Sequence, residues 1–321
     1  MKIEARTVSR RFAPHISVGD RIASLLGARV DRRAVQAVSE VSLGVAPGET
    51  LGLVGESGCG KSTLGRMLAG ILPPSAGQVL LDGAAPMQGA RKVTTRIQTV
   101  FQDPYASLNP RRRIGEAISE GPVAHGLVSR AEAPAMVGRW LARVGLDPAF
   151  AARFPHQFSG GQRQRVAIAR ALAMQPEMLV CDEPVASLDV SIQAQILNLF
   201  LDLRQEFRLT CLFISHDLGV VRHVSDRVAI MYLGRIVELG PAATVYATPR
   251  HPYTQGLLAS VPKLRLEGEA PPSFAPIAGE LPSPLSPPPG CAFHPRCARA
   301  TDRCRLERPP LVDGVACHHP G

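Results

Sequence analysis

The sequence predicts an α/β fold with a largely parallel sheet, and two observations support this. Four short, nearly continuous apolar runs end abruptly in polar residues, which is typical of buried parallel strands rather than of amphipathic helices. Helical stretches lie between these runs, so that strands and helices alternate along the chain. The expected strands are residues 50–54, 97–101, 178–181 and 211–214, and the expected helices are residues 62–69, 162–173 and 190–207.

The composition supports a packed globular protein. Of the 321 residues, 45% are hydrophobic and 20% are charged, which is too apolar for a disordered chain. No stretch approaches the roughly 18 consecutive apolar residues that a membrane helix requires. The first six residues are too charged to begin a secretory signal, so we expect a cytosolic setting.

The formal net charge of +9 does not by itself indicate nucleic-acid binding. The basic residues are spread along the chain, with only short clusters such as residues 111–113. A solvated basic surface is therefore favoured over a nucleic-acid-binding stripe. Attraction to the anionic inner face of a membrane, or to an acidic partner, is equally compatible with this charge.

Three regions differ in composition. From about residue 104 to residue 165, helical patches at 114–119 and 131–144 occur without a convincing strand. We expect these residues to form a helical subdomain inserted into a domain that spans residues 1–250. The extension at 251–321 holds many of the 29 prolines and four of the seven cysteines. Such a segment cannot bury much core, so something other than apolar packing should order it.

A glycine-rich sequence follows the first expected strand and leads into the first expected helix. Its glycines let the backbone curl until N–H groups point at phosphate oxygens, and the helix N-terminus adds partial positive charge. In this pattern Lys61 reaches the β- and γ-phosphates and the Ser62 hydroxyl ligates Mg²⁺. The flanking strand and helix favour nucleotide binding over an ordinary flexible turn. The residues expected to bind nucleotide here are Gly55, Glu56, Ser57, Gly58, Cys59, Gly60, Lys61, Ser62 and Thr63.

Polar side chains follow the other three expected strands. Asp182 stands where a magnesium-facing carboxylate belongs, and Glu183, one residue further on, could polarise an attacking water. His216 could exchange a proton near neutral pH or bridge to a γ-phosphate, and Gln102 could ligate Mg²⁺ or position water. Paired acids often serve solubility and a lone histidine is more often structural. Convergence of these strand ends beside a phosphate loop indicates a catalytic site instead.

A second small anion cradle is expected at Ser159-Gly160-Gly161, which precedes a helix and offers a hydroxyl and backbone N–H groups. Alone, these residues could form a flexible helix cap. Together with Gln162, the stretch at 158–165 resembles the signature of ATP-binding cassette proteins, with Phe158 in place of the more frequent leucine. The resemblance implies a P-loop NTPase core of the RecA-like type that binds ATP and Mg²⁺ and hydrolyses ATP.

The resemblance covers almost the whole chain and narrows to one subfamily. Four stretches and the cysteine-bearing tail are similar to the ATPase subunits of dipeptide, oligopeptide and nickel importers. These stretches are 102–110, 182–184, 188–195 and 251–254. One departure is Ala186-Ser187, where the subfamily more often has serine and then alanine. Asp189 remains in place, so we expect little consequence.

Residue roles in the catalytic site follow from this resemblance. Lys61 and Ser62 bind phosphate and Mg²⁺, and Asp182 holds the metal. Gln102 senses the nucleotide, Glu183 is the general base and His216 is the switch.

The resemblance also implies a dimer. In the family, two subunits face head to tail and trap ATP between the phosphate loop of one and the signature of the other, so a paralogous subunit or a second copy is needed. Ser159 and Gly161 contact the γ-phosphate across the dimer, Gly160 and Gln162 belong to the same site, and Asp189 links the two sites. Phe12 is the candidate for stacking on adenine, and a core or edge aromatic is an equal alternative.

The implied function is to power import of peptides or a similar solute. The partners would be two transmembrane permease subunits, reached through a groove near residues 102–110, and indirectly an extracytoplasmic solute-binding protein. The chain would lie peripherally on the cytoplasmic face of the inner membrane and would bind no nucleic acid. The alternative is a soluble cassette ATPase that acts on nucleic acid or the ribosome, although no second cassette or long insertion occurs. A small-molecule kinase would leave residues 159–162 unexplained.

Four cysteines lie in the tail, with five, six and twelve residues between them: Cys291, Cys297, Cys304 and Cys317. Disulfides are disfavoured in a reducing cytosol, and the spacing lacks the paired Cys-x-x-Cys of most structural zinc sites. Four thiolates around an iron–sulfur cluster fit the irregular spacing, and the subfamily resemblance points to a [4Fe-4S] cluster. Zinc and free structural thiols are the alternatives, and His294, His318 and His319 keep mixed ligation open.

Overall fold

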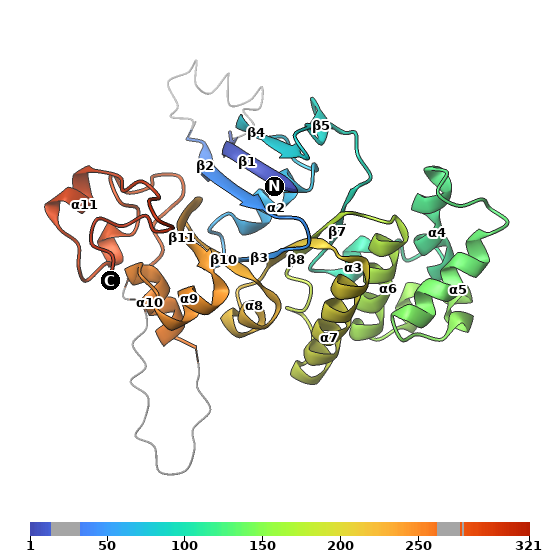
Figure 1. The fold of residues 1–321 in the computed structure, drawn as a ribbon. Coiled ribbons are helices and arrows are strands. Elements are labelled where there is room, and N and C mark those ends of the chain that lie inside the picture. The colour runs from blue at the N-terminus through green and yellow to red at the C-terminus, as the bar shows by residue number, and fades with distance from the viewer. Residues whose placement is uncertain (14–32, 262–276, 278) are drawn as a thin grey trace, which may run out of the picture.

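A six-stranded sheet forms the centre of the computed structural model, which describes residues 1–13, 33–261, 277 and 279–321. The strand order is β11 (Arg235–Pro241), β10 (Arg227–Tyr232), β3 (Thr50–Val54), β9 (Thr210–Ile214), β8 (Met178–Asp182) and β7 (Ile97–Val100). All neighbours are parallel except β10 and β11, which are antiparallel. The predicted α/β fold is confirmed (Figure 1).

A second, antiparallel sheet packs over one face of the central sheet. It contains β2 (Val35–Val45), β1 (Ile3–Phe12) and β4 (Ala76–Leu81), and a short hairpin follows it, β5 (Met87–Gln88) and β6 (Arg91–Lys92). Helix α2 (Lys61–Leu68) joins the two sheets, because its buried Leu64 and Met67 share one apolar core with Ile3 of β1 and Leu53 of β3. This core fixes the helix that follows the phosphate loop.

Helices cover the other face and extend away from it. α6 (Gly160–Ala173) and α7 (Val190–Phe207) share a core with the central strands through side chains such as Val166, Phe200 and Phe213. Beyond them lies the helical subdomain, on the side of the molecule opposite the C-terminal tail (Figure 1). Its elements are α3 (Pro104–Ser107), α4 (Ile114–Ala124), α5 (Ala133–Arg143), η1 (Pro148–Ala152) and η2 (Pro155–Gln157).

The C-terminal tail packs beside β11. After α8 (Leu218–Val224), the last elements are α9 (Ala242–Ala247), α10 (Pro252–Ala259), η3 (His294–Arg296) and α11 (Asp302–Leu306). The Ala316 N–H donates to the Val237 carbonyl at 2.8 Å, and the Leu239 N–H donates to the Gly314 carbonyl at 2.8 Å. The tail therefore continues the backbone pairing of the central sheet for a few residues.

All four expected strands and all the expected helices are present, with shifted ends. β7 ends at Val100, β8 continues to Asp182, and α4 continues to Ala124, five residues beyond its expected end. The antiparallel sheet and the β10–β11 pair were not predicted. Register shifts occur in the pairing of β1 with β2, so buried and exposed residues do not alternate regularly along these strands. The period-two pattern that identifies a half-buried strand is therefore missing from the sequence.

Within the described part of the chain, none of the helices has the length and hydropathy needed to cross a membrane.

Candidate nucleotide-binding site

The phosphate loop links the buried strand β3 to α2. Gly58 and Gly60 have φ angles of +79° and +106°, a region that favours glycine. A Cβ at Gly60 would lie 2.1 Å from the Ala37 carbonyl oxygen, and one at Gly55 would lie 2.2 Å from the Met231 carbonyl oxygen. Close backbone approach therefore requires glycine at Gly55 and Gly60, and the left-handed conformation favours it at Gly58 and Gly60.

Lys61 organises the loop from within. Its side chain is 5% exposed, and its Nζ donates hydrogen bonds to the Gly55 carbonyl at 2.7 Å and the Glu56 carbonyl at 3.1 Å. The loop thus curls around the ammonium group, as a phosphate cradle requires. Ser57 and Gly58 are exposed, and Thr63 lies in the first turn of α2. The Cys59 thiol is buried in the core and burial raises its pKa, so its side chain does not contribute to the loop surface.

Ser62 and Asp182 meet beside the loop. The Ser62 hydroxyl donates to Asp182 Oδ1 at 2.9 Å. Asp182 ends β8, is 7% exposed, and has its pKa raised by burial. A hydroxyl oxygen and a carboxylate are hard oxygen ligands of the kind that Mg²⁺ prefers. The two predicted protein ligands on α2 and β8 therefore lie together, as expected.

Gln102 and His216 converge on the Glu183 carboxylate. Gln102 Nε2 donates to Glu183 Oε2 at 3.2 Å, and His216 Nδ1 lies 3.2 Å from the same oxygen. The Glu183 side chain is 14% exposed, whereas that of His216 is 54% exposed. Three residues that follow three different parallel strands are thus brought to one point, which is the arrangement the sequence predicted.

The signature residues and Asp189 form a separate cluster. Ser159 caps α6: its hydroxyl accepts from the Gln162 N–H at 3.3 Å, and Gln162 Oε1 accepts from the Ser159 N–H at 3.0 Å. A Cβ at Gly161 would lie 2.5 Å from Ile192 in the first turn of α7, the helix capped by Asp189. Ser159 and Asp189 are exposed. The signature therefore presents an exposed surface beside the α7 N-terminus.

Phe12 ends β1 and is 40% exposed. The Arg10 guanidinium lies over its ring at 4.9 Å from the centroid. The segment that follows it, from Ala13 to Arg33, falls largely outside the described residues. Stacking of Phe12 on adenine stays a prediction.

The four tail cysteines line one cavity of about 10 Å³, together with histidines that include His251, His294, His318 and His319. Burial, and to a smaller extent the neighbouring Cys304, Cys317 and Cys297 thiols, raises the pKa of Cys291 to about 11. The His319 N–H donates to the Cys317 sulfur at 3.3 Å. Among the described residues, no group of three or more His, Cys, Asp or Glu has an arrangement that could hold a metal ion. The cysteine and histidine side chains therefore lie around one cavity, as the sequence suggested, but their arrangement is not that of metal ligands.

Two contacts to the phosphate loop were not predicted. Arg296 and Tyr253, both beyond residue 250, bind Glu56. Tyr253 belongs to the stretch that carried the subfamily resemblance, but its contact partner lies 197 residues away and no periodicity or spacing identifies it.

Two family models match the chain. The model described as ABC transporter matches residues 38–186, and the model described as oligopeptide/dipeptide transporter, C-terminal region, matches residues 237–304.

Curated relatives match nearly the whole chain. A putative peptide import ATP-binding protein of Brucella abortus is 55% identical, over 89% of this chain and 87% of the relative. The oligopeptide transport ATP-binding protein AppF of Bacillus subtilis is 50% identical, over 88% of this chain and 89% of the relative. The di/tripeptide transport ATP-binding protein DppF of Pseudomonas aeruginosa is 51% identical, over 89% of this chain and 90% of the relative.

Solved structures share the fold. CbiO1 from Clostridium perfringens, part of an ABC transporter complex, gives a TM-score of 0.62 at 28% identity and covers 77% of this chain and 90% of its own. A dimeric bacterial ABC transporter cassette gives a TM-score of 0.62 at 26% identity, over 75% of this chain and 98% of the cassette. A post-hydrolysis state of the same cassette, bound to ADP and Pi, gives a TM-score of 0.60 at 25% identity.

The fold and the site define an ATP-hydrolysing ATP-binding cassette. The chain belongs to the ABC transporter ATP-binding proteins, and within them to the subfamily that carries the oligopeptide/dipeptide transporter C-terminal region. The resemblance inferred from the sequence is confirmed. The roles of individual residues stay predictions.

Proposed function

We propose that this chain hydrolyses ATP to power import of peptides, or of a similar solute, through membrane-embedded partner subunits. The observation that carries this proposal is the convergence of Gln102 and His216 on Glu183, next to the Ser62–Asp182 pair and the phosphate loop. The peptide cargo is supported by relatives described as peptide, oligopeptide and di/tripeptide transport ATP-binding proteins. None of these descriptions supports the alternative role on nucleic acid or the ribosome.

The chemistry assigned to the site is attack of water on the γ-phosphorus. The loop N–H groups and Lys61 would bind the phosphates, and Glu183 would accept the proton of the attacking water. Gln102 and His216 both contact Glu183 Oε2, so they would fix the direction of the carboxylate. Mg²⁺ held by Ser62 and Asp182 would supply positive charge to the phosphate oxygens.

A second cassette subunit would complete the site. Ser159 and Asp189 are exposed at the starts of α6 and α7, where a facing phosphate loop could reach them. A dimeric cassette is among the solved structures of this fold. We propose a head-to-tail pairing, with a paralogous subunit forming a heterodimer or with a second copy of this chain.

Transmembrane permease subunits are the proposed membrane partners. Tyr105, in the stretch expected to receive them, is 59% exposed, and the Arg163 guanidinium lies 3.5 Å from its ring centroid. Docking there would place the chain peripherally on the cytoplasmic face of the inner membrane, with an extracytoplasmic solute-binding protein acting only through the permease.

For the region beyond residue 250, we propose a distinct extension whose four cysteines hold a [4Fe-4S] cluster, with zinc as the alternative. Thiolate is a ligand of both groups, and the four thiols line one small cavity, although they would have to move into ligand geometry. A resident group would also order a segment that has little apolar core.

Purification of the intact assembly through a tag on this chain tests the proposed function. We expect hydrophobic companion subunits, and ATPase activity that rises when di- or oligopeptides and the solute-binding protein are added to the assembly in proteoliposomes. Stimulation by nucleic acid or ribosomes, with no hydrophobic companion, would support the alternative instead.

The cysteine site has its own test. The protein prepared without oxygen should be brown and contain iron, and Cys297→Ser should lose both, whereas Cys181→Ala, which removes a buried thiol of β8, should keep them. A colourless wild type with bound zinc would favour the alternative, and one with neither metal would refute both.

A further inference from the structure

The cysteine-bearing tail contacts the phosphate loop at Glu56. Arg296, at the end of η3, donates two hydrogen bonds to the Glu56 carboxylate, at 2.7 and 2.9 Å. Its side chain is 5% exposed, and that of Glu56 is 28% exposed. Paired bonds from a guanidinium to a carboxylate fix orientation as well as distance. The contact therefore sets where the Glu56 side chain lies.

Tyr253 holds the backbone of the same residue. The Glu56 N–H donates to the Tyr253 hydroxyl at 3.0 Å, and Tyr253 is fully buried. Its ring packs edge-on against Tyr232, with centroids 4.7 Å apart, and lies 5.4 Å from the ring of Phe293. This aromatic packing leaves the hydroxyl little freedom to follow a displaced loop.

The backbone carbonyl of Glu56 links the tail contacts to Lys61 of the phosphate loop. Its carbonyl accepts from Lys61 Nζ at 3.1 Å. The N–H, the carboxylate and the carbonyl of Glu56 are therefore bound by Tyr253, Arg296 and Lys61 respectively. Any shift of Glu56 moves a carbonyl that directs the lysine expected to bind phosphate.

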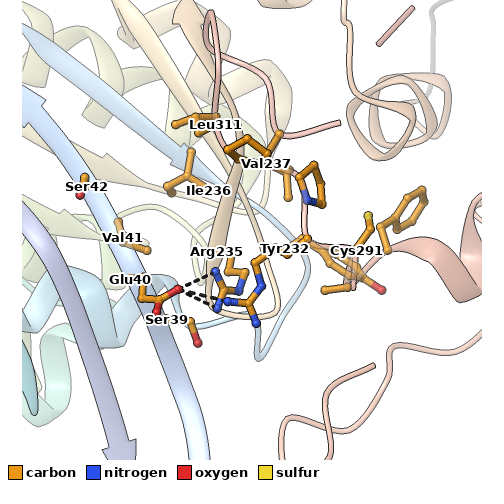
Figure 2. A pocket seen from close by; sticks show the side chains of 16 residues that line it. Ser39, Glu40, Val41, Ser42, Tyr232, Arg235, Ile236, Val237, Cys291 and Leu311 are labelled. Carbon is orange, nitrogen blue, oxygen red and sulfur yellow. Dashed lines mark hydrogen bonds and ion pairs between the residues drawn. The ribbon is translucent and has the colours of Figure 1, made fainter. Parts of the chain in front are cut away.

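The tail is also attached to the cassette at a second place, through Glu40 of β2. A cavity of about 390 Å³ lies between β2, β11 and the tail. Glu40 of β2 pairs there with Arg235 of β11 (Figure 2) and with Arg308 of the tail. Glu40 Oε2 lies 3.1 Å from an Arg308 nitrogen. Together with the backbone pairing of Gly314 and Ala316 to β11, this contact should hold the tail in place when Arg296 is changed.

We propose that Arg296 and Tyr253 are positioning residues for the ATP site, acting through Glu56 on the phosphate loop and Lys61. ATP affinity would then depend on the tail, whichever group its cysteines hold. The inference rests on ATP binding and not on the identity of the transported solute, so the two can fail independently.

The test measures binding of MgAMP-PNP to the full chain by calorimetry. Arg296→Gln should weaken binding about tenfold, equivalent to about 1.4 kcal/mol, and Arg296→Lys, which keeps the charge without the paired geometry, should restore part of it. Tyr253→Phe should weaken binding in the same direction. In the assembled transporter the loss should appear in the KM for ATP rather than in kcat, because neither residue contacts Glu183 or the reacting phosphate.

Arg308→Gln is the matched control, because it removes a tail-to-cassette ion pair that does not touch the loop. It should change affinity by less than about twofold, as expected for an exposed pair. Equal affinities of wild type, Arg296→Gln and Tyr253→Phe would overturn the proposal.

A variant that loosens the whole tail is separated from a local effect by a double-mutant cycle. Glu56→Gln leaves every tail residue unchanged. The double variant Glu56→Gln/Arg296→Gln should bind MgAMP-PNP no more weakly than whichever single variant has the lower affinity, because each substitution removes the same interaction. Additive losses, with increased reactivity of the tail thiols in Arg296→Gln alone, would show that Arg296 only holds the tail together and would refute the positioning role.

Discussion

Glu183 has a left-handed backbone conformation, with φ at +48°. This region is costly for a residue with a side chain, and such residues gather at functional sites. The Glu183 N–H donates to the Ile214 carbonyl at 3.0 Å, which ties the residue to the end of β9. The residue that carries this conformation is the one on which Gln102 and His216 converge.

Replacing this carboxylate by an amide tests its role. Glu183→Gln should lower kcat by about 10²–10⁴-fold, because the amide cannot accept a proton from water. ATP binding should persist, since the phosphates are bound by other groups, and a closed dimer should accumulate in size-exclusion chromatography with MgATP. Unchanged hydrolysis would contradict the assignment. Glu206→Gln, which removes an exposed partner of Arg143 on α7, is the control.

At this scale the sequence predicted most of the candidate site. Asp182, Glu183, Gln102 and His216 were identified because polar residues after parallel strands meet at one edge of a sheet. The Arg296–Glu56 contact could not be predicted from the sequence, because the two residues are 240 positions apart and their pairing depends on how the tail folds back onto the cassette.

At the scale of elements, continuous apolar runs located the buried strands, and helical periodicity located α2, α6 and α7. The same reasoning could not find the antiparallel sheet. In β1, for example, Val8 and Ser9 are consecutive buried residues, which conflicts with simple alternation. Close packing against α2 fixes those strands, and that packing is visible only in three dimensions.

Two glycines of the phosphate loop give a matched comparison. Gly60→Ala should lower the free energy of unfolding by about 2–3 kcal/mol and weaken ATP binding severely, because its Cβ would collide with the Ala37 carbonyl. A Cβ at Gly58 would meet open space. Gly58→Ala should therefore lower the free energy of unfolding by only about 1 kcal/mol, for a left-handed backbone at a residue with a side chain. Urea unfolding and nucleotide binding measure both. Equal effects of the two variants would show that the close approach is unimportant.

Across the whole molecule, a charge cluster connects the two sheets. Lys2, which directly precedes β1, binds both Asp82 and Glu177, as does Arg96, which precedes β7. Hydrogen bonds from Arg96, and then from Lys2, lower the pKa of Glu177 to about 2. The ionised carboxylate therefore stabilises the fold above its ordinary pKa of 4.5, and this contribution is lost as the pH falls from 4.5 toward 2.

Glu177→Gln should accordingly destabilise the protein at pH 7, and the difference from the wild type should shrink as the pH falls from 4.5 toward 2. We expect a loss of about 1 kcal/mol at pH 7, because the side chain is 43% exposed and solvent screens the pair. Chemical denaturation at a series of pH values measures the difference between the variant and the wild type. A difference that stays constant from pH 7 to pH 3.5 would exclude this charge contribution.

The tail also determines how the protein behaves when it is shortened. β11 is the last strand on its side of the central sheet, and Gly314 and Ala316 use part of its outward-facing backbone. A chain truncated before Gly314 would expose unpaired N–H and C=O groups there, and such rows recruit strands from other molecules. Truncation should therefore promote aggregation, which light scattering of the shortened and the full chain would measure.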